Sequence, residues 1–382
     1  MRLTKFVVPE IIFGNGALLE VGRAVIRLGG SRAMVVTDPG VVEAGWTKKV
    51  TQCLDAVDVP WSLWSALTPN PKDVEIDSGV QQYLQEHCDC LVAIGGGSVI
   101  DAAKAIGAVV VHGTRIHEFE GTDRVGHPLP PLVAIPTTAG TGADVSQFAV
   151  IVDTSRRSKM VMISKSFIPD ICLSDPTTLM TKSAELTAYT GIDALTHAIE
   201  AYVSRAATPL TDGYALRAIR LVATSLRQSV ASRSNSGAKE SMMMASLQAG
   251  IAFSNAVLGA VHAMSHAIGG MLDLPHGLIN GVLLPYVTEF NLLACPDRFR
   301  DVAETFGERI DHAHPMEAAE KSIRAIQRLC TDIGIPSRLR DLEIPKELIG
   351  EYSSRAVQDP CLATNPRDMS HTDLLALFEA AW

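Results

Sequence analysis

Residues 191–200 of this chain read GIDALTHAIE, and residues 259–277 read GAVHAMSHAIGGMLDLPHG. Each stretch contains two residues of metal-binding types spaced four positions apart. The first pair is Asp193 with His197, and the second is His262 with His266. A fifth residue of the same kind, His276, follows. Positions i and i+4 share one face of a helix, so two facing helices would bring a carboxylate and several imidazoles together. Three nitrogens and one oxygen can hold a divalent transition metal with a position left open for substrate.

The composition is that of a folded, acidic protein. Its 382 residues suggest two domains. With 47% hydrophobic and 20% charged residues, the chain can bury sizeable cores. The formal net charge is −9 and no basic run occurs, which argues against nucleic acid as a partner because phosphate binding requires clustered Lys and Arg.

The cysteines and the N-terminus bear on the compartment. The chain has seven cysteines in no disulfide-like framework, and Cys88 with Cys90 forms C-x-C, which is neither a redox C-x-x-C nor half of a zinc ribbon. The first residues, MRLTKFVVPEIIFGNG, lack the pattern of a signal peptide. No apolar run approaches the roughly 20 residues of a membrane helix. We expect a cytoplasmic protein without a membrane partner.

The first half of the chain alternates short apolar runs with helical patterns, which predicts an α/β domain with a parallel sheet. The predicted strands cover 33–36, 91–94 and 132–135, with a further strand pair at 148–153 and 159–163. Helices are predicted at about 73–87 and 98–110.

The strands stop near residue 180, and the second half is predicted to be entirely helical. The segments with a 3.6-residue period are 183–204, 210–230, 239–256, 277–293, 297–310, 315–333 and 371–381. Residues 232–239, SRSNSGAK, are predicted to form a mobile loop. We therefore predict an α/β dinucleotide-binding domain over 1–182 and an all-α metal-binding domain over 183–382.

The segment GGGSVIDAAK (95–104) lies between a predicted strand and a predicted helix. Its three glycines would let the backbone approach a pyrophosphate and adopt positive φ where needed. The helix N-terminus would then offer amides and a partial positive charge to the anion. The steric alternative is an ordinary glycine-rich turn. The pattern differs from G-x-G-x-x-G, in which an acid follows the glycines by about 20 residues.

Two further strand ends are candidates for cofactor contacts. Asp38 precedes the glycines, and it could accept hydrogen bonds from an adenosine ribose and repel a 2′-phosphate, which favours NAD over NADP. The local alternative is a turn that Asp38 starts with Pro39. PTTAGTGAD (136–144) supplies hydroxyls and amides suited to phosphate oxygens, although an ordinary polar turn has the same composition.

These motifs together resemble the iron-containing (group III) alcohol dehydrogenases, and the resemblance runs from EIIFGNGAL (10–18) to the C-terminal helices. It implies an N-terminal NAD(P)-binding α/β domain, a C-terminal helical metal-binding domain and an active site in the cleft between them, a dehydroquinate synthase-like fold. It further implies that Asp193, His197, His262 and His276 are the metal ligands and that His266 transfers the proton near the nicotinamide.

The resemblance also assigns residues around the cofactor and the substrate. Those expected at NAD are Asp38, Asn70, Gly95, Gly96, Gly97, Ser98, Asp101, Thr137, Thr138, Thr141, Lys159 and Leu179. Those expected near the substrate are Phe253 and Cys361. One departure occurs at Ala143-Asp144, where the family usually has Ser-Glu, and the shorter acid is expected to alter a hydrogen bond behind the second loop.

Simpler interpretations exist for each metal-site residue taken singly. An Asp–His pair at i and i+4 is usually a solvated ion pair, and a lone histidine on an apolar helix is usually a packed core residue. The joint pattern argues otherwise, because burying several imidazoles without partners is costly. A closed structural zinc site usually contains cysteine, and no cysteine lies between Asp193 and His276.

The predicted function is NAD-dependent, metal-dependent interconversion of small primary alcohols or diols and aldehydes. The resemblance favours Fe(II), and Zn(II) is possible. Related activities are a glycerol dehydrogenase, a hydroxyacid–oxoacid transhydrogenase and a maleylacetate reductase, although the retained ligands argue against the last. A non-enzymatic NAD- or metal-sensing regulator is the alternative from another class. A homodimer is expected from base rates and from the family.

Overall fold

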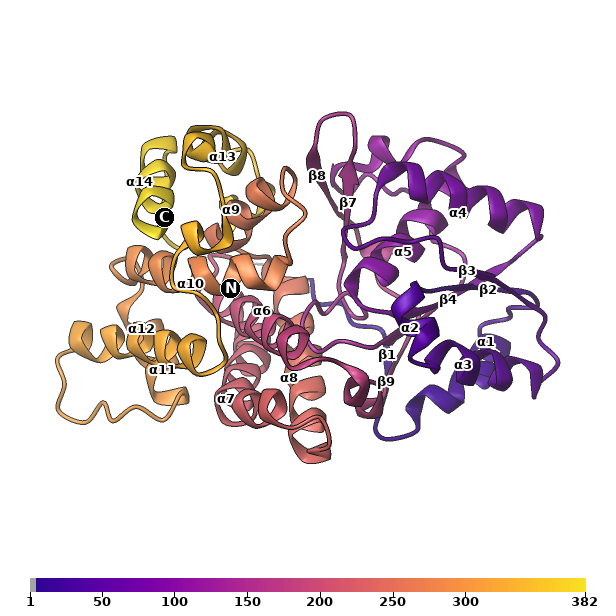
Figure 1. The fold of residues 1–382 in the computed structure, drawn as a ribbon, viewed down its shortest axis with the longest axis horizontal. Coiled ribbons are helices and arrows are strands. Elements are labelled where there is room, and N and C mark those ends of the chain that lie inside the picture. Colours follow the sequence, from indigo (N-terminus) through magenta and orange to yellow (C-terminus); the bar gives the residue numbers. More distant parts are fainter. Residues whose placement is uncertain (1–4) are drawn as a thin grey trace. The chain divides into compact units, whose positions relative to one another are not determined.

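The computed structural model describes residues 5–382. The chain forms two compact units, Met1–Thr181 and Lys182–Trp382, coloured indigo to magenta and magenta to yellow in Figure 1. Each unit has its own secondary structure class and is described by itself.

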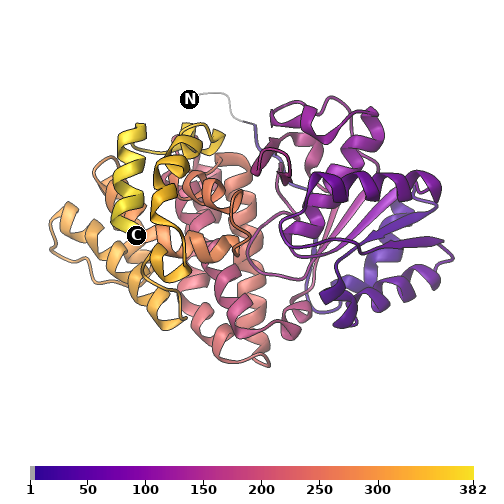
Figure 2. The same ribbon diagram turned by 45° about the horizontal axis from the view of Figure 1, so that its top comes forward.

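The first unit is built on a parallel sheet, whose strands are drawn as arrows in Figure 2. The sheet has six strands in the order β1-β9-β6-β4-β2-β3. Their bounds are β1 Glu10–Phe13, β2 Ala33–Val36, β3 Trp61–Trp64, β4 Cys90–Gly95, β6 Leu132–Pro136 and β9 Ile171–Ser174. A second sheet of three strands, β5 Gly121–Thr122, β7 Phe148–Asp153 and β8 Ser158–Ile163, contains an antiparallel hairpin of β7 with β8. The predicted α/β class and all five predicted strands are confirmed.

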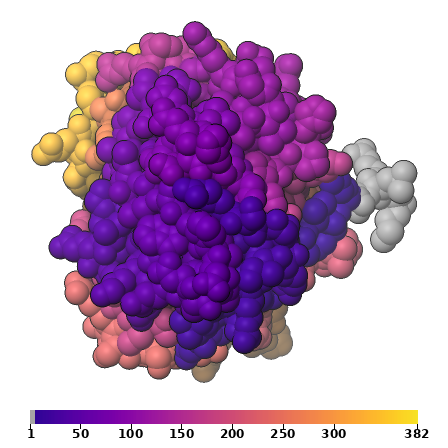
Figure 3. All heavy atoms as spheres, turned by 90° about the vertical axis from the view of Figure 1, so that its right-hand side faces the viewer, coloured from indigo at the N-terminus to yellow at the C-terminus, as the bar shows by residue number. Residues whose placement is uncertain are grey.

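Helices cover both faces of the parallel sheet. Their bounds are α1 Val21–Arg27, α2 Pro39–Glu43, α3 Trp46–Asp55, α4 Asp73–Gln85 and α5 Gly97–His112. Along β2 the side chains alternate: Met34 and Val36 join the core on the side of α4 and α5, while Ala33 and Val35 join the core on the side of α1 and α3. The two cores explain why the central strands are continuous apolar runs. In the view of Figure 3, the indigo to magenta atoms of this unit face the viewer.

Strands β1, β3 and β9 were not predicted, for reasons visible in their positions. β1 and β3 lie at the two edges of the sheet, where most residues are only partly buried and the apolar signal is weak. β9, with the sequence ICLS, is buried but has only four residues. The edge strands need neighbours for stability, and the sequence pattern does not reveal which neighbours they have.

The order of strands creates a switch point between β2 and β4. From β2 the chain moves outward to β3, whereas from β4 it moves in the opposite direction to β6. In sheets of this kind, ligands bind outside the carboxyl ends of the strands at such a point. Asp38 follows β2, the glycine segment follows β4, and Thr137 follows β6. The three candidate cofactor segments therefore end three adjacent strands.

The second unit contains only helices and turns within its described residues. The α-helices are α6 Ala184–Val203, α7 Pro209–Ala231, α8 Ser236–Ala256, α9 Ala260–Gly269, α10 His276–Leu292, α11 Pro296–Thr305, α12 Pro315–Asp332, α13 Ile349–Ala356 and α14 His371–Ala381. The predicted all-helical half is confirmed, and α13 was not predicted. The expected mobile loop at 232–239 is wrong in extent, because α8 begins at Ser236 and Asn235 caps it by accepting a hydrogen bond from Ala238.

Local sequence signals start several of these helices. Ser183 accepts a hydrogen bond from the amide of Leu186 at the start of α6. Ser370 and Asp373 form a capping box at the start of α14. Such caps satisfy amides that have no partner within the helix. They fix where α6, which carries two candidate ligands, begins.

The helices also bear on membrane insertion. Within the described residues, no single helix is both long and apolar enough to cross a bilayer. By length and composition alone, α8 and α9 pass that test only as a pair, and they are bent by 100° at their junction.

The junction of α8 and α9 contains a strained residue. Val257 has φ 61° and ψ −170°, a conformation that is almost confined to glycine and rare for a β-branched residue. Hydrogen bonds hold the backbone on both sides. Ser204 Oγ donates to Ala256 O at 2.5 Å, and Thr364 Oγ1 donates to Leu258 O at 2.6 Å. This clamped turn sets the direction in which α9 leaves.

We expect Val257→Gly to stabilise the protein. The strained conformation costs about 1–3 kcal/mol, whereas the extra freedom of an unfolded glycine costs roughly 0.5–1 kcal/mol, so the free energy of unfolding should rise by about 1 kcal/mol. Thermal unfolding checks this. Val257→Ala, which retains the strain, is the control and should not raise the midpoint. A glycine variant no more stable than the alanine variant would contradict the assignment of strain.

Candidate active site

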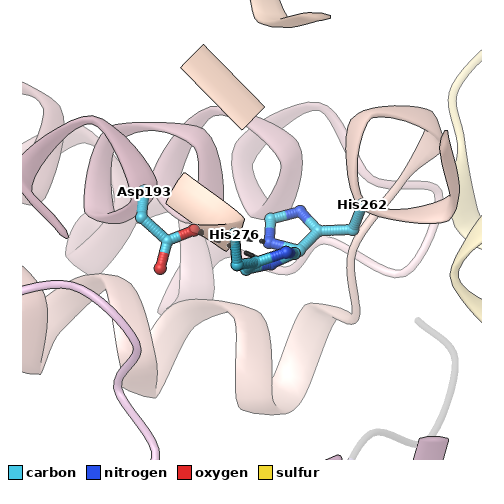
Figure 4. Close-up of side chains that lie close together, drawn as sticks. All are labelled: Asp193, His262 and His276. Atoms are coloured by element: carbon cyan, nitrogen blue, oxygen red, sulfur yellow. Dashed lines mark ion pairs between the residues drawn. The ribbon is translucent and has the colours of Figure 1, made fainter. Parts of the chain in front are cut away.

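Three imidazoles of the second unit approach one carboxylate oxygen, that of Asp193. The Nε2 atoms of His197, His262 and His276 each lie 3.9 Å from Asp193 Oδ1. Figure 4 shows Asp193, His262 and His276 pointing towards one another from three helices, α6, α9 and α10. Ligand atoms around a tetrahedral ion are about 3.4 Å apart for bonds near 2.1 Å. The donor atoms of Asp193, His262 and His276 lie within 4.8 Å of one another, which is compatible with a divalent metal site, and this group does not include His197.

A glycine next to His276 makes this convergence possible. A Cβ atom added to Gly277 would lie 2.1 Å from the carbonyl oxygen of Tyr189 and 3.0 Å from Asp193 Cβ. Any side chain would push the start of α10 away from α6. Gly277 thus lets the first turn of α10 bring His276 to the carboxylate of Asp193.

The side chain of Asn280 lies at the centre of the ligand atoms. Its Nδ2 is 2.7 Å from Asp193 Oδ1, 3.1 Å from His276 Nε2 and 3.3 Å from His262 Nε2. Its Oδ1 is buried and has no hydrogen-bond partner among the described residues. Rotation of the amide exchanges its donor and acceptor ends, so Asn280 can present either end to the centre. An amide that can turn its unpartnered oxygen towards two imidazoles and a carboxylate fits a site for a cation.

Two of the candidate ligands are held through their second ring nitrogen. His262 Nδ1 is 2.5 Å from Glu200 Oε2, and the same carboxylate accepts a hydrogen bond from the Val261 amide at 2.7 Å. His276 Nδ1 is 2.9 Å from Ser265 Oγ. A hydrogen bond at Nδ1 directs the other nitrogen, Nε2, towards a metal. Burial raises the pKa of Glu200 to about 7.

Aromatic stacking holds the third imidazole. The ring of His197 stacks on Phe253 with centroids 4.4 Å apart and on His262 with centroids 4.6 Å apart. Phe253, expected near the substrate, is buried and lies against a candidate ligand. Aromatic contacts of this kind fix ring orientation as well as burying area.

His266 has separate partners. It lies one helical turn after His262 on α9, and its Nδ1 is 2.8 Å from Asp359 Oδ2. Its ring stacks on that of His276 with centroids 5.3 Å apart. Burial alone would raise the pKa of Asp359, but the charge of His266 and the hydrogen bonds from His266 and Cys361 outweigh it and lower that pKa. Cys361, also expected near the substrate, is buried, and its Sγ atom lies within 4.8 Å of ligand atoms of both residues.

In the first unit, the glycine segment serves close packing rather than unusual dihedrals. None of Gly95, Gly96 and Gly97 has positive φ. A Cβ atom on Gly97 would lie 2.7 Å from the side chain of Thr141, and one on Gly95 would lie 2.4 Å from Val99. The glycines therefore allow the two candidate cofactor loops to touch, and Gly97 and Ser98 start α5 as expected.

Behind the loops lies a buried charged cluster. Lys104 is fully buried, and its Nζ donates to the carbonyl oxygens of Ser146 and Phe148 at 2.9 and 2.8 Å. Asp101 Oδ2 accepts a hydrogen bond from the Val150 amide at 3.1 Å. Desolvation raises the pKa of Asp101 and lowers that of Lys104. Asp101 thus links α5 to the hairpin of β7 and β8 through a hydrogen bond.

The shorter acid of the second loop has a defined partner. Asp144 Oδ2 accepts a hydrogen bond from Cys172 Sγ at 3.1 Å, and both groups are buried. Asp144 thus links the second loop to β9 through a thiol.

The remaining residues expected at the cofactor are distributed over the strand ends. Thr137 is buried with an Oγ1 that has no partner among the described residues, and Thr138 lies beside Gly96. Asp38 Oδ1 caps α2 by accepting a hydrogen bond from the Val41 amide at 2.9 Å. Asp38 therefore has a local structural role at the start of this helix. The others expected there are placed as follows: Asn70 in the segment after β3, Lys159 on β8, and Leu179, buried, after β9.

Several partners of the site residues were missed. Glu200 is seven positions after Asp193, and Asn280 is four after His276, so helical spacing puts each on the face of a ligand and could have identified them. Asp359 is 93 residues from His266, and no local pattern connects the two.

Known proteins match this chain over nearly its whole length. The model of the iron-containing alcohol dehydrogenase family matches residues 9–176, and that of the Fe-containing alcohol dehydrogenase family, C-terminal, matches residues 187–382. A 1,3-propanediol dehydrogenase of Klebsiella pneumoniae is 42% identical, with 100% of this chain and 99% of that protein covered. An NAD-dependent methanol dehydrogenase of Bacillus methanolicus is 39% identical, with 98% and 99% covered.

Solved structures agree. A crystal structure of a 1,3-propanediol oxidoreductase, 42% identical, has a TM-score of 0.97 with all of both chains covered. An alcohol dehydrogenase from Oenococcus oeni, 36% identical, has the same TM-score and coverage. This chain, with a parallel α/β unit and a helical unit that gathers three histidines and an aspartate, belongs to the iron-containing alcohol dehydrogenase family and is an enzyme that interconverts alcohols and aldehydes.

Proposed function

We propose that this dehydrogenase uses NAD and Fe(II) and acts on small primary alcohols or diols. The observation that carries the proposal is the approach of three imidazole Nε2 atoms to one oxygen of Asp193, each at 3.9 Å. Relatives named as 1,3-propanediol and methanol dehydrogenases support the substrate class.

The metal would be held by Asp193, His197, His262 and His276. Imidazole and carboxylate ligands suit Fe(II), and they also accept Zn(II). Asp193, His197 and His262 are at most 5% exposed, so a cation would offset the cost of removing these polar groups from water.

The cofactor would lie across the carboxyl ends of β2, β4 and β6. The amides at the start of α5 would face the pyrophosphate, since the first amides of a helix are unsatisfied within it. The orphaned Oγ1 of Thr137 would find a partner there. Asp38 would accept from the ribose hydroxyls while still capping α2, and its charge would disfavour a 2′-phosphate. The remaining cofactor residues are those expected from the family.

The chain's own groups would position the substrate and move its proton. When bound, a divalent ion would supply Lewis acidity and NAD would supply a hydride acceptor. His266, held by Asp359, would take the alcohol proton and pass it towards solvent. Phe253 and Cys361 would contribute to the substrate's surroundings.

The organisation that we propose assigns NAD binding to residues 1–182 and metal binding with catalysis to residues 183–382. We further propose a homodimer in the cytoplasm. All seven cysteines are free thiols, which fits a reducing compartment.

Anaerobic reconstitution tests the function. Protein stripped with a chelator is loaded with Fe(II) or with Zn(II), and NADH formation is followed with short primary alcohols and diols. Metal-dependent turnover is expected, with Fe(II) more effective. Absence of turnover with either metal, despite tight NAD binding, would contradict the proposal.

Two histidines on α9 should separate metal binding from proton transfer. His262→Ala should lose metal and activity together, because His262 is a ligand. His266→Ala should keep the metal and lose rate by roughly 100-fold or more. Metal content and kcat measured on the same samples check both. Release of the metal from His266→Ala would show that its role is assigned wrongly.

We expect Glu200→Gln to weaken metal binding by about 10- to 100-fold. The neutral amide is a weaker acceptor for His262 Nδ1 and fixes its ring less firmly. Competition with a chelator measures the affinity. Glu185→Gln is the matched control, because Glu185 lies exposed on the same helix and accepts a hydrogen bond from the Tyr189 hydroxyl at 2.8 Å. Equal affinities in both variants would argue against the positioning of His262 by Glu200.

Asp38→Asn should broaden the cofactor choice. Asparagine can still cap α2 through its oxygen, while removal of the charge removes a repulsion of roughly 1–4 kcal/mol at about 4 Å. The ratio of kcat/KM for NADP over NAD should rise about tenfold or more. Asp55→Asn, an exposed change in the same unit, should leave the ratio unchanged. A constant ratio in Asp38→Asn would exclude Asp38 from cofactor discrimination.

A further inference from the structure

The carboxylate of Asp359 connects two separate elements. Its Oδ2 is 2.8 Å from His266 Nδ1, and its Oδ1 accepts a hydrogen bond from the Cys361 amide at 2.8 Å. The second contact caps the short helix Pro360–Thr364, labelled η7. The side chains of His266 and Asp359 are each 8% exposed. Each carboxylate oxygen therefore has its own fixed donor in a nearly dry environment.

This geometry determines which ring nitrogen of His266 carries hydrogen. An ionised carboxylate can only accept, so the hydrogen in the 2.8 Å contact belongs to Nδ1. In the neutral ring, Nε2 then holds a lone pair and can accept a proton. Stacking on His276, with planes 13° apart, restricts rotation of the ring about this hydrogen bond.

His262, one turn earlier on α9, shows that a carboxylate at Nδ1 does not by itself decide what the histidine does. His262 is held by Glu200 in the same way, through Nδ1 at 2.5 Å, but its Nε2 lies with the ligand atoms around Asp193 Oδ1. Among the described residues, His266 forms no ion pair with Asp193. Its free Nε2 is therefore available to a substrate proton instead of a metal.

We propose that Asp359 is a positioning residue that fixes the tautomer and orientation of His266, so that Nε2 faces the reacting alcohol as a proton acceptor. The proposal rests on the role of His266 in the proposed function. It goes further by assigning a residue that no motif identifies, and by predicting a tautomer that can be observed without turnover.

Asp359→Asn separates this role from helix capping. The asparagine oxygen can still accept from the Cys361 amide, so the cap of η7 is retained. The asparagine NH2 group then faces His266 Nδ1 and can only donate to it. His266 should switch to the tautomer with hydrogen on Nε2, and it should no longer accept the alcohol proton.

The first readout is the tautomer itself. Metal-free protein labelled with 15N in its histidine rings is studied by NMR, and the His266 signals are assigned as those missing in His266→Gln. The wild type should show the Nδ1–H tautomer and Asp359→Asn the Nε2–H tautomer. An Nε2–H tautomer in the wild type would overturn the proposal without any variant, even if Asp359→Asn failed to fold.

The second readout is kinetic. With metal loaded, Asp359→Asn should lose kcat by about 100-fold or more, with metal content and the KM for alcohol nearly unchanged. Asp359→Glu restores a carboxylate and should recover part of the rate. Asp373→Asn, which alters the exposed capping box of α14, is the control and should match the wild type.

The outcomes distinguish a failure of the positioning role of Asp359 from a failure of the proposed function. Loss of metal from Asp359→Asn, or loss of rate without a tautomer switch, would overturn the positioning role. A wild type that shows the Nδ1–H tautomer but no turnover with any alcohol would instead contradict the proposed function.

Discussion

The placement of four donor groups around one buried point constrains the second unit more than any other feature. Three imidazoles and a carboxylate cannot be removed from water cheaply unless they satisfy one another or a cation. Their atoms come from three helices, and the helix ends must approach closely for the donors to meet. A Cβ atom on Gly277 would lie only 2.1 Å from Tyr189 O. The backbones of α10 and α6 can therefore approach this closely only because residue 277 has no side chain.

The histidines of the site share one structural principle with different consequences. His262, His266 and His276 are each held at Nδ1, by Glu200, Asp359 and Ser265 respectively. Fixing one nitrogen leaves the other with a defined chemical character. Two of the rings point Nε2 to a common centre, whereas the third lies beside it. Roles are thus divided by where α9 and α10 place each ring, and the strained turn at Val257 sets the course of α9.

Local patterns predicted the parts of the structure that local physics determines. The buried strands β2, β4 and β6 were visible as apolar runs, and the ligand pairs were visible as i and i+4 spacings. The edge strands β1 and β3 were not, because pairing rather than composition stabilises them. Asp359 could not be found because 93 residues separate it from His266. The glycine segment does lie between a strand and a helix as predicted, and the close approach of Thr141 to Gly97, without positive φ, became visible only in the structure.

The division of the chain into two compact units has a thermodynamic consequence. All four candidate metal ligands belong to Lys182–Trp382, and the segments proposed to hold the pyrophosphate belong to Met1–Thr181. A ligand stabilises whatever folded part it binds, by RT ln(1 + [L]/Kd). On the proposed assignment, metal would therefore add its binding free energy to the folded helical unit, and NAD would add its own to the folded α/β unit.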